Sequence, residues 1–384
     1  MILGVWCRNV ELRSVGLSIR QRIAVPRNDP RYQKPWRKVV SRCQYLVYSC
    51  HPAASAKAHP LELRRALAAL SPLAPMIFAT SPLCPSHDPG PNHPEKVARY
   101  HSVLDALQAA DLLSRSTRIE GKPASEEDLL LVHDAAYIEL AKREIQYGYD
   151  HLSTGDTQVC AASWSAAQAA AGCAIEATEA VVKGPHKTAF CLVRPPGHHA
   201  SAAIGMGFCI LNNVAIAARY AQRRLGLERI LIVDWDVHHG NGTQNIFYHD
   251  RNVFFFSTHQ SPWYPGTGRA SETGEGAGVG TTLNCPLPAG SGRTAVFSCF
   301  EKQLLPAMEK FRPELVFISA GFDSRKGDPL GKFELSDTDF ADLTNCVREI
   351  AAKNADGRVV SVLEGGYSLS GLASAATAHV GALL

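Results

Sequence analysis

The segment Ile230-Leu231-Ile232-Val233-Asp234-Trp235-Asp236-Val237-His238-His239-Gly240 joins an unbroken apolar run to a cluster of carboxylate and imidazole side chains. A short apolar run without polar alternation is typical of a strand that is buried on both faces, as in a parallel sheet. In such sheets ligands bind beyond the carboxyl ends of the strands. The segment therefore predicts a parallel α/β fold with a functional site where this strand ends.

Apolar runs of the same kind recur along the chain, at Ile77–Thr80, Thr188–Val193, Val253–Ser257, Leu315–Ala320 and Val359–Leu363. Helical patterns lie between them, at Pro94–Leu113, Thr157–Val182, Asn212–Leu225, Ala295–Phe311 and Asp337–Lys353. Alternating strands and helices imply parallel strands joined by right-handed crossovers. We therefore expect an α/β fold, a three-layer αβα sandwich with a mostly parallel central sheet.

The composition of the 384 residues, 46% apolar and 20% charged, is that of a soluble protein with a large core. The most apolar helical segment, Thr157–Val182, carries Gln168, Glu176 and Glu179, so we expect a packed surface helix and no membrane span. The eleven cysteines form no CxxC pair. We therefore expect reduced thiols and a cytoplasmic protein.

Residues 1–75 differ in kind from the rest of the chain. They hold thirteen Lys or Arg against three acidic residues, a balance of +10, which leaves −7 for residues 76–384. We predict a basic, disordered extension at 1–75 and a catalytic domain at 76–384. An extension of this composition fits an organellar transit peptide, a functional basic tail, or a start codon assigned too early, since Met76 directly precedes the first predicted strand.

Two carboxylates and an imidazole are expected at the same edge of the sheet. Asp236 and His238 share one face of an extended segment, and Asp323 follows the strand Leu315–Ala320. Two Asp and one His would leave the fourth position of a zinc ion open, as a catalytic site requires. The alternative, that these Asp are helix caps or turn residues, leaves two buried carboxylates without a partner.

Two further clusters follow predicted strands. In Arg194-Pro195-Pro196-Gly197-His198-His199 the prolines stiffen a loop that carries two imidazoles, which suit either metal binding or proton transfer. In Glu364-Gly365-Gly366-Tyr367 the phenol could donate a hydrogen bond to a developing oxyanion, or simply pack in the core. Our first hypothesis therefore groups His198, Asp236, His238 and Asp323 as one zinc centre.

The segments RPPGHH, DWDVHHGNGTQ, GFDSRKGDPL and EGGY, in this order, resemble the zinc-dependent histone deacetylases, most closely the class II branch. The resemblance covers Met76–Leu384, including HPE at His93 and YPGTG at Tyr264, and excludes residues 1–75. It implies the arginase/deacetylase fold. It also implies a hydrolase that removes acyl groups from amines, most often acetyl groups from lysine.

The resemblance also implies a role for each site residue. Three of them would bind a single Zn²⁺ ion per chain: Asp236, His238 and Asp323. The imidazoles of His198 and His199 would then not be ligands, and His199 would act as general base and then general acid. Their orienting partners would be Asp234 for His198 and Asn241 for His199, while Tyr367 would polarise the acyl carbonyl. A potassium ion would be held near the zinc by Asp234, Asp236, His238, Ser257 and Thr258.

The substrate tunnel is implied by three further positions. Phe208 and Tyr264 match the aromatic walls around the acyl-lysine stem, although plain core packing would also suit them. Leu330 matches a rim position where polyamine-selective relatives carry an acid, so an acetylated protein or peptide is the expected partner. We interpret the glycine-rich stretch Gly266–Gly280 as a flexible loop, because it lacks the lysine and the setting of a phosphate-binding loop.

Three alternatives differ from this expectation. The first is a deacetylase of acetylpolyamines or another small acetylated amine. The second is a binding scaffold with a silent active site, which the retained Tyr367 and ligand set disfavour. The third is a two-metal ureohydrolase on the same general fold. No pattern specifies nucleic-acid binding or an oligomeric state.

Overall fold

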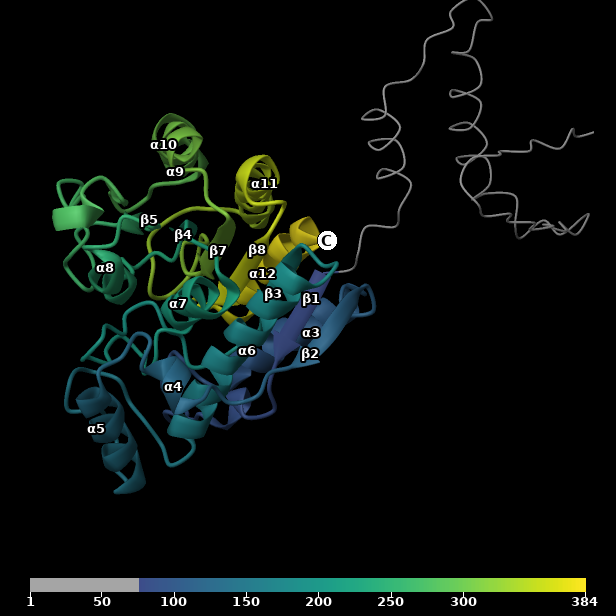
Figure 1. Ribbon diagram of the computed structural model, residues 1–384. Helices are drawn as coiled ribbons and strands as arrows, with labels where there is room; N and C mark the ends of the chain where they lie inside the picture. Colours follow the sequence, from purple (N-terminus) through teal and green to yellow (C-terminus); the bar gives the residue numbers. More distant parts are fainter. Residues whose placement is uncertain (1–75) are drawn as a thin grey trace, which may run out of the picture. The chain divides into compact units, whose positions relative to one another are not determined.

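An eight-stranded parallel sheet forms the centre of residues 76–384, the part of the chain that the computed structural model describes (Figure 1). Its strand order is β2-β1-β3-β8-β7-β4-β5-β6, and every neighbouring pair is parallel. The strands are β1 (Met76–Thr80), β2 (Ser116–Glu120), β3 (Thr188–Cys191), β4 (Ile230–Asp234), β5 (Val253–Gln260), β6 (Thr282–Leu287), β7 (Leu315–Ala320) and β8 (Val359–Leu363). The predicted parallel α/β fold is confirmed.

The six predicted strands are those buried on both faces. Every residue of β3, β4, β7 and β8 is buried, as their unbroken apolar runs indicate. The two strands that the sequence did not reveal lie at the edges of the sheet. In β2 polar side chains are half-exposed or exposed, and β6 carries Pro286, so neither reads as an apolar run.

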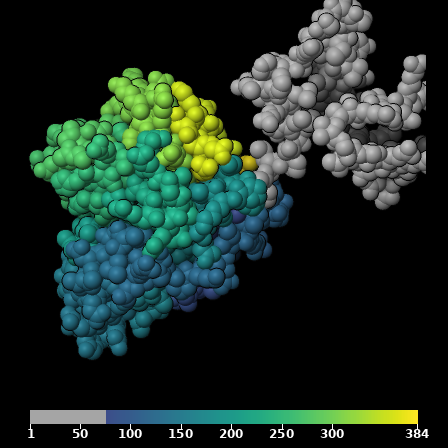
Figure 2. Space-filling view, viewed as in Figure 1, coloured from purple at the N-terminus to yellow at the C-terminus, as the bar shows by residue number. Residues whose placement is uncertain are grey.

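Helices cover both faces of the sheet (Figure 1). They are α3 (Ala98–Ala109), α4 (Glu126–Leu129), α5 (Ala135–Gln146), α6 (Ser163–Lys183), α7 (Asn213–Leu225), α8 (Asn241–Phe247), α9 (Arg293–Cys299), α10 (Leu305–Phe311), α11 (Asp337–Asn354) and α12 (Leu369–Leu383). Helices α6 and α7 pack on one face, and α3, α11 and α12 pack together on the other. The segment that carries α4 and α5, blue in Figure 2, abuts α6 and α7.

Helix ends follow local capping chemistry. The side chain of Asn212 accepts a hydrogen bond from the Ala215 N–H at 3.0 Å and begins α7, which ends at Gly226 in the left-handed conformation. Ser336 and Asp339 form a reciprocal capping box at the start of α11. These caps fix where the two helices enter and leave the layers.

Three helix predictions differ from the structure. The helix predicted from Pro94 begins at Ala98, and Glu95, which precedes it, forms buried ion pairs with Arg194 and Arg99. The helix predicted at Ala295–Phe311 is divided into α9 and α10 by a π-helical turn at Phe300–Leu304. Helix α6 is more buried than a surface helix, since it lies between the sheet and other helices.

The predictions for residues 1–75 lie outside the described residues. Within residues 76–384 no helix is both long and apolar enough to cross a membrane. The eight cysteines of this part of the chain are free thiols.

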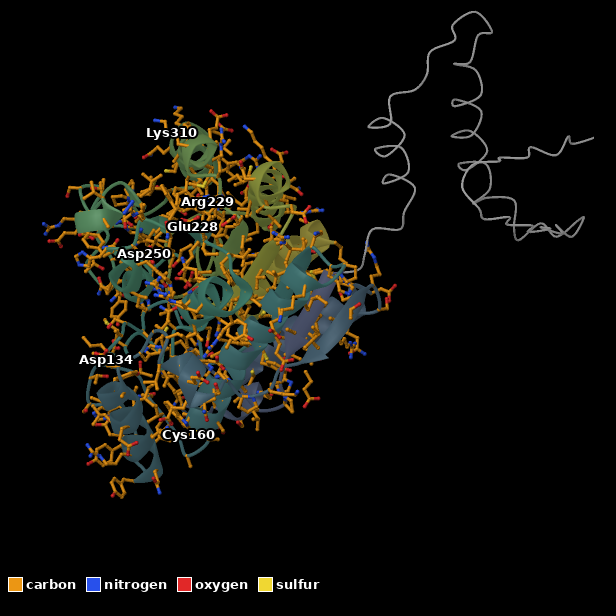
Figure 3. All side chains as sticks on the ribbon, in the orientation of Figure 1. Asp134, Cys160, Glu228, Arg229, Asp250 and Lys310 are labelled. Carbon is orange, nitrogen blue, oxygen red and sulfur yellow. The ribbon has the colours of Figure 1, made fainter. Side chains whose placement is uncertain are left out.

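The central strands are parallel, so their carboxyl ends all lie along the same end of the sheet, across the strand direction. Glu228 and Arg229 directly precede β4 and Asp250 precedes β5, so these three residues, labelled in Figure 3, belong to the amino ends of the strands. The loops after β3, β4, β7 and β8 therefore converge, and these loops carry the RPPGHH, DWDVHHG, GFD and EGGY motifs. The topology brings the four motifs to a single site.

Candidate active site

Asp236, His238 and Asp323 converge at the carboxyl ends of β4 and β7. One ligand atom from each lies within 4.8 Å of the others, and all three residues are buried. The Nδ1 atom of His238 lies 2.9 Å from Asp236 Oδ1 and 3.2 Å from Asp323 Oδ2. Backbone N–H groups hold the carboxylates in place, since Val237 N donates to Asp323 Oδ1 and Gly365 N donates to Asp236 Oδ2.

This cluster has the features of a cation site. Within residues 76–384, Asp323 Oδ2 is one of few buried side-chain oxygens that accept no well-formed hydrogen bond, and its close neighbour is His238 Nδ1 at 3.2 Å. Burial and the neighbouring Asp236 raise the pKa of Asp323 to about 7. A Cβ atom on Gly365 would overlap carboxylate oxygens of both Asp residues, so the space beside them suits only glycine. Two carboxylates and an imidazole with this spacing fit a divalent ion such as zinc.

His198 lies beside this cluster and is paired with Asp234. Its Nδ1–H donates to Asp234 Oδ2 at 3.0 Å, and its Nε2 lies 3.8 Å from Asp236 Oδ2. Although burial by itself lowers the pKa of His198, the two carboxylates overcome it and raise that pKa to about 10. The His198–Asp234 pair therefore favours an imidazolium.

His199 has the opposite electrostatic character. Burial, followed by the charges of His198 and His238, holds the pKa of His199 well below its usual value. Its Nδ1–H donates to Asn241 Oδ1 at 2.7 Å, and Asn241 begins α8. Because this bond occupies Nδ1, Nε2 of a neutral His199 is free to accept a proton.

Glu364 anchors the loop that carries both imidazoles, a role that the sequence reasoning missed. Its Oε2 accepts hydrogen bonds from Gly197 N at 2.6 Å and His198 N at 3.2 Å, and its Oε1 accepts one from Ser319. Burial raises the pKa of Glu364 to about 7. A glutamate placed directly after the buried strand β8 was the available signal, because a buried carboxylate needs partners.

Tyr367 is held from two sides. Asp328, which the sequence reasoning assigned no role, accepts hydrogen bonds from Tyr367 N at 2.7 Å and Ser368 N at 3.0 Å. The Arg99 guanidinium lies 5.0 Å from the centre of the Tyr367 ring. Burial and the nearby Asp323 raise the pKa of Tyr367 well above its usual value, so the phenol keeps its proton and can donate a hydrogen bond.

A cavity of about 230 Å³ leads to these groups. It is lined by Asp156, His199, Gly207, Phe208, His238, Trp263, Tyr264, Leu330 and Tyr367. Phe208 has a left-handed backbone with φ of 68°, a conformation that a bulky residue rarely adopts and that is often found at functional sites. The structure thus places the three predicted tunnel residues on one cavity and adds Asp156 and Trp263, which no sequence pattern had revealed.

The remaining predicted positions lie next to the cluster. Ser257 and Thr258 are buried in β5, and Ser257 is paired in register with Asp234 of β4. All predicted site residues therefore meet at one edge of the sheet. A buried Asp-His-Asp set beside a cavity, flanked by two imidazoles and a phenol, defines a class of metal-dependent hydrolase.

Comparisons with known proteins give the family. Residues 93–383 match the family model of the histone deacetylase domain. The chain is 40% identical over 315 residues to histone deacetylase 10, chloroplastic, of Oryza sativa subsp. japonica, covering 78% of this chain and 71% of the relative. It is 40% identical over 301 residues to the polyamine deacetylase HDAC10 of Homo sapiens, covering 76% of this chain and 44% of the relative. The crystal structure of the HDA15 HD domain is similar, with a TM-score of 0.76, 34% identity, and 81% and 88% coverage.

The chain belongs to the histone deacetylase family. It is a deacetylase, a hydrolase with the arginase/deacetylase fold, and its family is in general zinc-dependent.

Proposed function

We propose that this protein removes acetyl groups from lysine side chains of proteins or peptides, with one zinc ion per chain. The observation that carries the proposal is the lining of the cavity, in which exposed or half-buried apolar and aromatic side chains lie together with the buried His199 and His238; these side chains are Trp263, Tyr264, Phe208 and Leu330. A cavity lined by aromatic and aliphatic side chains suits the methylene stem of an acyl-lysine. The rim residue Leu330 offers no charge to a second ammonium group.

Asp236, His238 and Asp323 would hold the zinc ion. The close approach of two buried carboxylates and an imidazole, with Asp323 Oδ2 accepting no well-formed hydrogen bond, supports this ligand set. When bound, zinc would lower the pKa of a water molecule and polarise the acyl carbonyl.

The protein's own groups would then manage protons and charge. His199 Nε2 would take a proton from the attacking water, because the Asn241 hydrogen bond fixes the tautomer that leaves Nε2 free. His198, kept cationic by Asp234, would stabilise negative charge that develops on the oxygen atoms of the tetrahedral intermediate. Tyr367 would donate a hydrogen bond to the developing oxyanion, and the protonated His199 would release the proton to the departing amine.

The alternative substrate is an acetylpolyamine or another small acetylated amine. Two observations favour it. The human relative of 40% identity is named a polyamine deacetylase. The exposed Asp156 lines the cavity, where its carboxylate could face a distal ammonium group. Asp156 Oδ1 already accepts hydrogen bonds from Gly207 N and Tyr264, however, so this carboxylate also has a structural use.

A competition assay tests the proposal. The zinc-loaded protein would receive an acetyl-lysine peptide and N-acetylated spermidine at equal concentrations. We expect the larger kcat/KM for the peptide. A clear preference for the polyamine would overturn the substrate assignment, and binding without turnover of either would indicate a silent scaffold.

We further propose a potassium ion beside the zinc loop, held by oxygen atoms of Asp234, Asp236, His238, Ser257 and Thr258. The proximity of β4 and β5, whose registers pair Asp234 with Ser257, supports it. Activity measured in potassium and in tetramethylammonium chloride at equal ionic strength would test this, with equal rates contradicting it.

We propose that residues 76–384 form the catalytic domain and residues 1–75 a separate basic extension. Free thiols support a cytoplasmic compartment, whereas the chloroplastic rice relative supports an organelle. Deacetylase activity of a variant that lacks residues 1–75, together with the location of the full chain fused to a fluorescent protein, would separate these possibilities.

A further inference from the structure

A chain of polar side chains joins the metal-bearing loop to one wall of the tunnel. His239, next to the ligand His238, has its Nδ1 atom 2.8 Å from Thr267 Oγ1 and its Nε2 atom 2.9 Å from Gln244 Oε1. Gln244 Nε2 in turn donates to Glu272 Oε2 at 2.7 Å. Thr267 and Glu272 belong to the loop after Tyr264, so the contacts cross from one loop to the other.

The direction of every hydrogen bond in this chain is determined. Gln244 Oε1 also accepts from Asn284 Nδ2 at 2.7 Å, and an amide oxygen can only accept. His239 must therefore donate from Nε2, which leaves Nδ1 to accept the Thr267 hydroxyl proton. A neutral His239 in this single tautomer makes a hydrogen bond to each of its two partners, Thr267 and Gln244.

The same loop also packs closely on two imidazole rings. Gly268 has φ of 85°, and a Cβ atom there would lie 2.5 Å from His259 Nε2 and 2.6 Å from the His239 ring. Its carbonyl accepts from His259 Nε2 at 2.9 Å, and its N–H donates to Glu272 Oε2 at 3.2 Å. The first half of the stretch expected to be a flexible loop is thus anchored to the metal-bearing side.

We propose that the chain Thr267–His239–Gln244–Glu272, here called the wall latch, fixes the position of Tyr264 and thereby sets which acyl-lysine side chains the tunnel accepts. Tyr264 lies three residues before Thr267 and forms the cavity wall, with its ring centre 5.2 Å from that of His199. Glu272 does not line the cavity, so it is a positioning residue that acts through Tyr264. The acyl-lysine readout rests on the function proposed above.

Glu272→Ala and Thr267→Val each remove one end of the latch without touching the cavity. Glu275→Ala is the matched control, since Glu275 is an exposed carboxylate of the same loop and its Oε2 atom lies 4.0 Å from His249 Nε2, outside the latch. Glu272→Gln keeps an oxygen acceptor for Gln244, so its amide exchange and its substrate preference should stay close to those of the parent protein. Zinc content is measured for every variant, because a change in it would indicate a role in metal binding instead.

The first measurement needs no activity. Hydrogen–deuterium exchange of the segment 263–274 should quicken in Glu272→Ala and Thr267→Val but not in Glu275→Ala, because the Gly268 amide loses its acceptor or its neighbour. Exchange equal to that of the control would overturn the latch.

The second measurement is the ratio of kcat/KM for an acetyl-lysine peptide to that for the matching butyryl-lysine peptide. Losing one hydrogen bond of the latch should change this ratio by about threefold to tenfold. In a Tyr264→Ala background the same substitutions should leave the ratio unchanged, because the latch acts through Tyr264. A merely structural role of Glu272 or Thr267 would change the ratio in both backgrounds. An unchanged ratio in the single variants, or a change that survives Tyr264→Ala, would overturn the proposal. If the parent protein hydrolyses neither peptide, the proposed function fails while the exchange measurement still decides whether the latch exists.

Discussion

The Nδ1 atom of His199 lies 2.7 Å from the amide oxygen of Asn241, whereas its neighbour His198 faces the carboxylate of Asp234. Two adjacent imidazoles thus have partners of different charge. A neutral partner leaves the pKa of His199 low, and a charged partner raises that of His198. This difference assigns the base and the cation within one His-His pair.

Asn241→Asp should shift the pH dependence of catalysis. A carboxylate beside Nδ1 favours the imidazolium and raises the pKa of His199, so the base form is populated only at higher pH. We expect the acidic limb of the kcat/KM profile to move up by about one pH unit or more. An acidic limb at the same pH in both proteins would contradict the assignment of His199 as the base.

Metal removal should reduce both activity and stability. Asp236 and Asp323 are buried close together, and a divalent ion offsets their repulsion. Zinc at about 1,000 times its dissociation constant should raise the free energy of unfolding by about 4 kcal/mol. Asp323→Asn should weaken zinc binding and lose this gain, as measured by metal content and thermal unfolding. Equal zinc content in the variant and the parent would contradict the ligand assignment.

Acid should destabilise the fold through buried neutral histidines. Burial lowers the pKa of His133 to about 4 and that of His379 to about 3, from an ordinary 6.5. Between the folded-state pKa of each histidine and 6.5, the unfolded chain therefore binds more protons than the folded chain. The stabilisation that the two neutral histidines contribute to the fold is complete above pH 6.5 and is lost as the pH falls. Each group contributes a slope of up to about 1.4 kcal/mol per pH unit.

Urea unfolding at pH 7 and pH 5 tests this effect. His133 uses both ring nitrogens, facing Ser201 O at 2.9 Å and accepting from Asn212 N at 3.0 Å, so protonation breaks one bond. His133→Gln should have a smaller stability loss between the two pH values than the parent. An equal loss in both proteins would show that His133 does not contribute.

The rim position offers a test of substrate choice. Leu330→Glu would place a carboxylate at the cavity mouth beside Trp263, whose indole N–H donates to the Leu330 carbonyl at 2.8 Å. We expect the kcat/KM for an acetylpolyamine to rise relative to an acetyl-lysine peptide, on the order of tenfold for one added charge contact. Leu330→Gln is the uncharged control. An equal shift in both variants would contradict an electrostatic rim.

The sequence predicted what depends on long apolar runs and on motifs at their ends. The strands β3, β4, β7 and β8 are wholly buried, and such strands have the clearest pattern. Because parallel strands end at one edge, the motifs that follow them were expected to meet. The first hypothesis grouped His198 with the zinc ligands, whereas the cluster in the structure consists of Asp236, His238 and Asp323. His198 lies beside this cluster, with its Nε2 atom 3.8 Å from Asp236 Oδ2.

What the sequence could not predict comes from contacts between distant segments. Asp156 and Trp263 reach the cavity from irregular loops, which have no periodicity. Asp328 and Glu364 act through backbone N–H groups, which any residue supplies, so no motif marks their partners. The edge strands β2 and β6 carry polar residues or proline and therefore lack the apolar signal.

The most direct test of the central claim is turnover of an acetyl-lysine peptide by the zinc-loaded protein and by its Tyr367→Phe variant, with zinc content measured in both. The variant keeps the ring beside Arg99 and Phe208 but loses the hydroxyl that would stabilise the oxyanion. We predict equal zinc content and a kcat lower by about 100-fold to 1,000-fold. Unchanged turnover in Tyr367→Phe, or no turnover by the parent protein, would contradict the proposed mechanism.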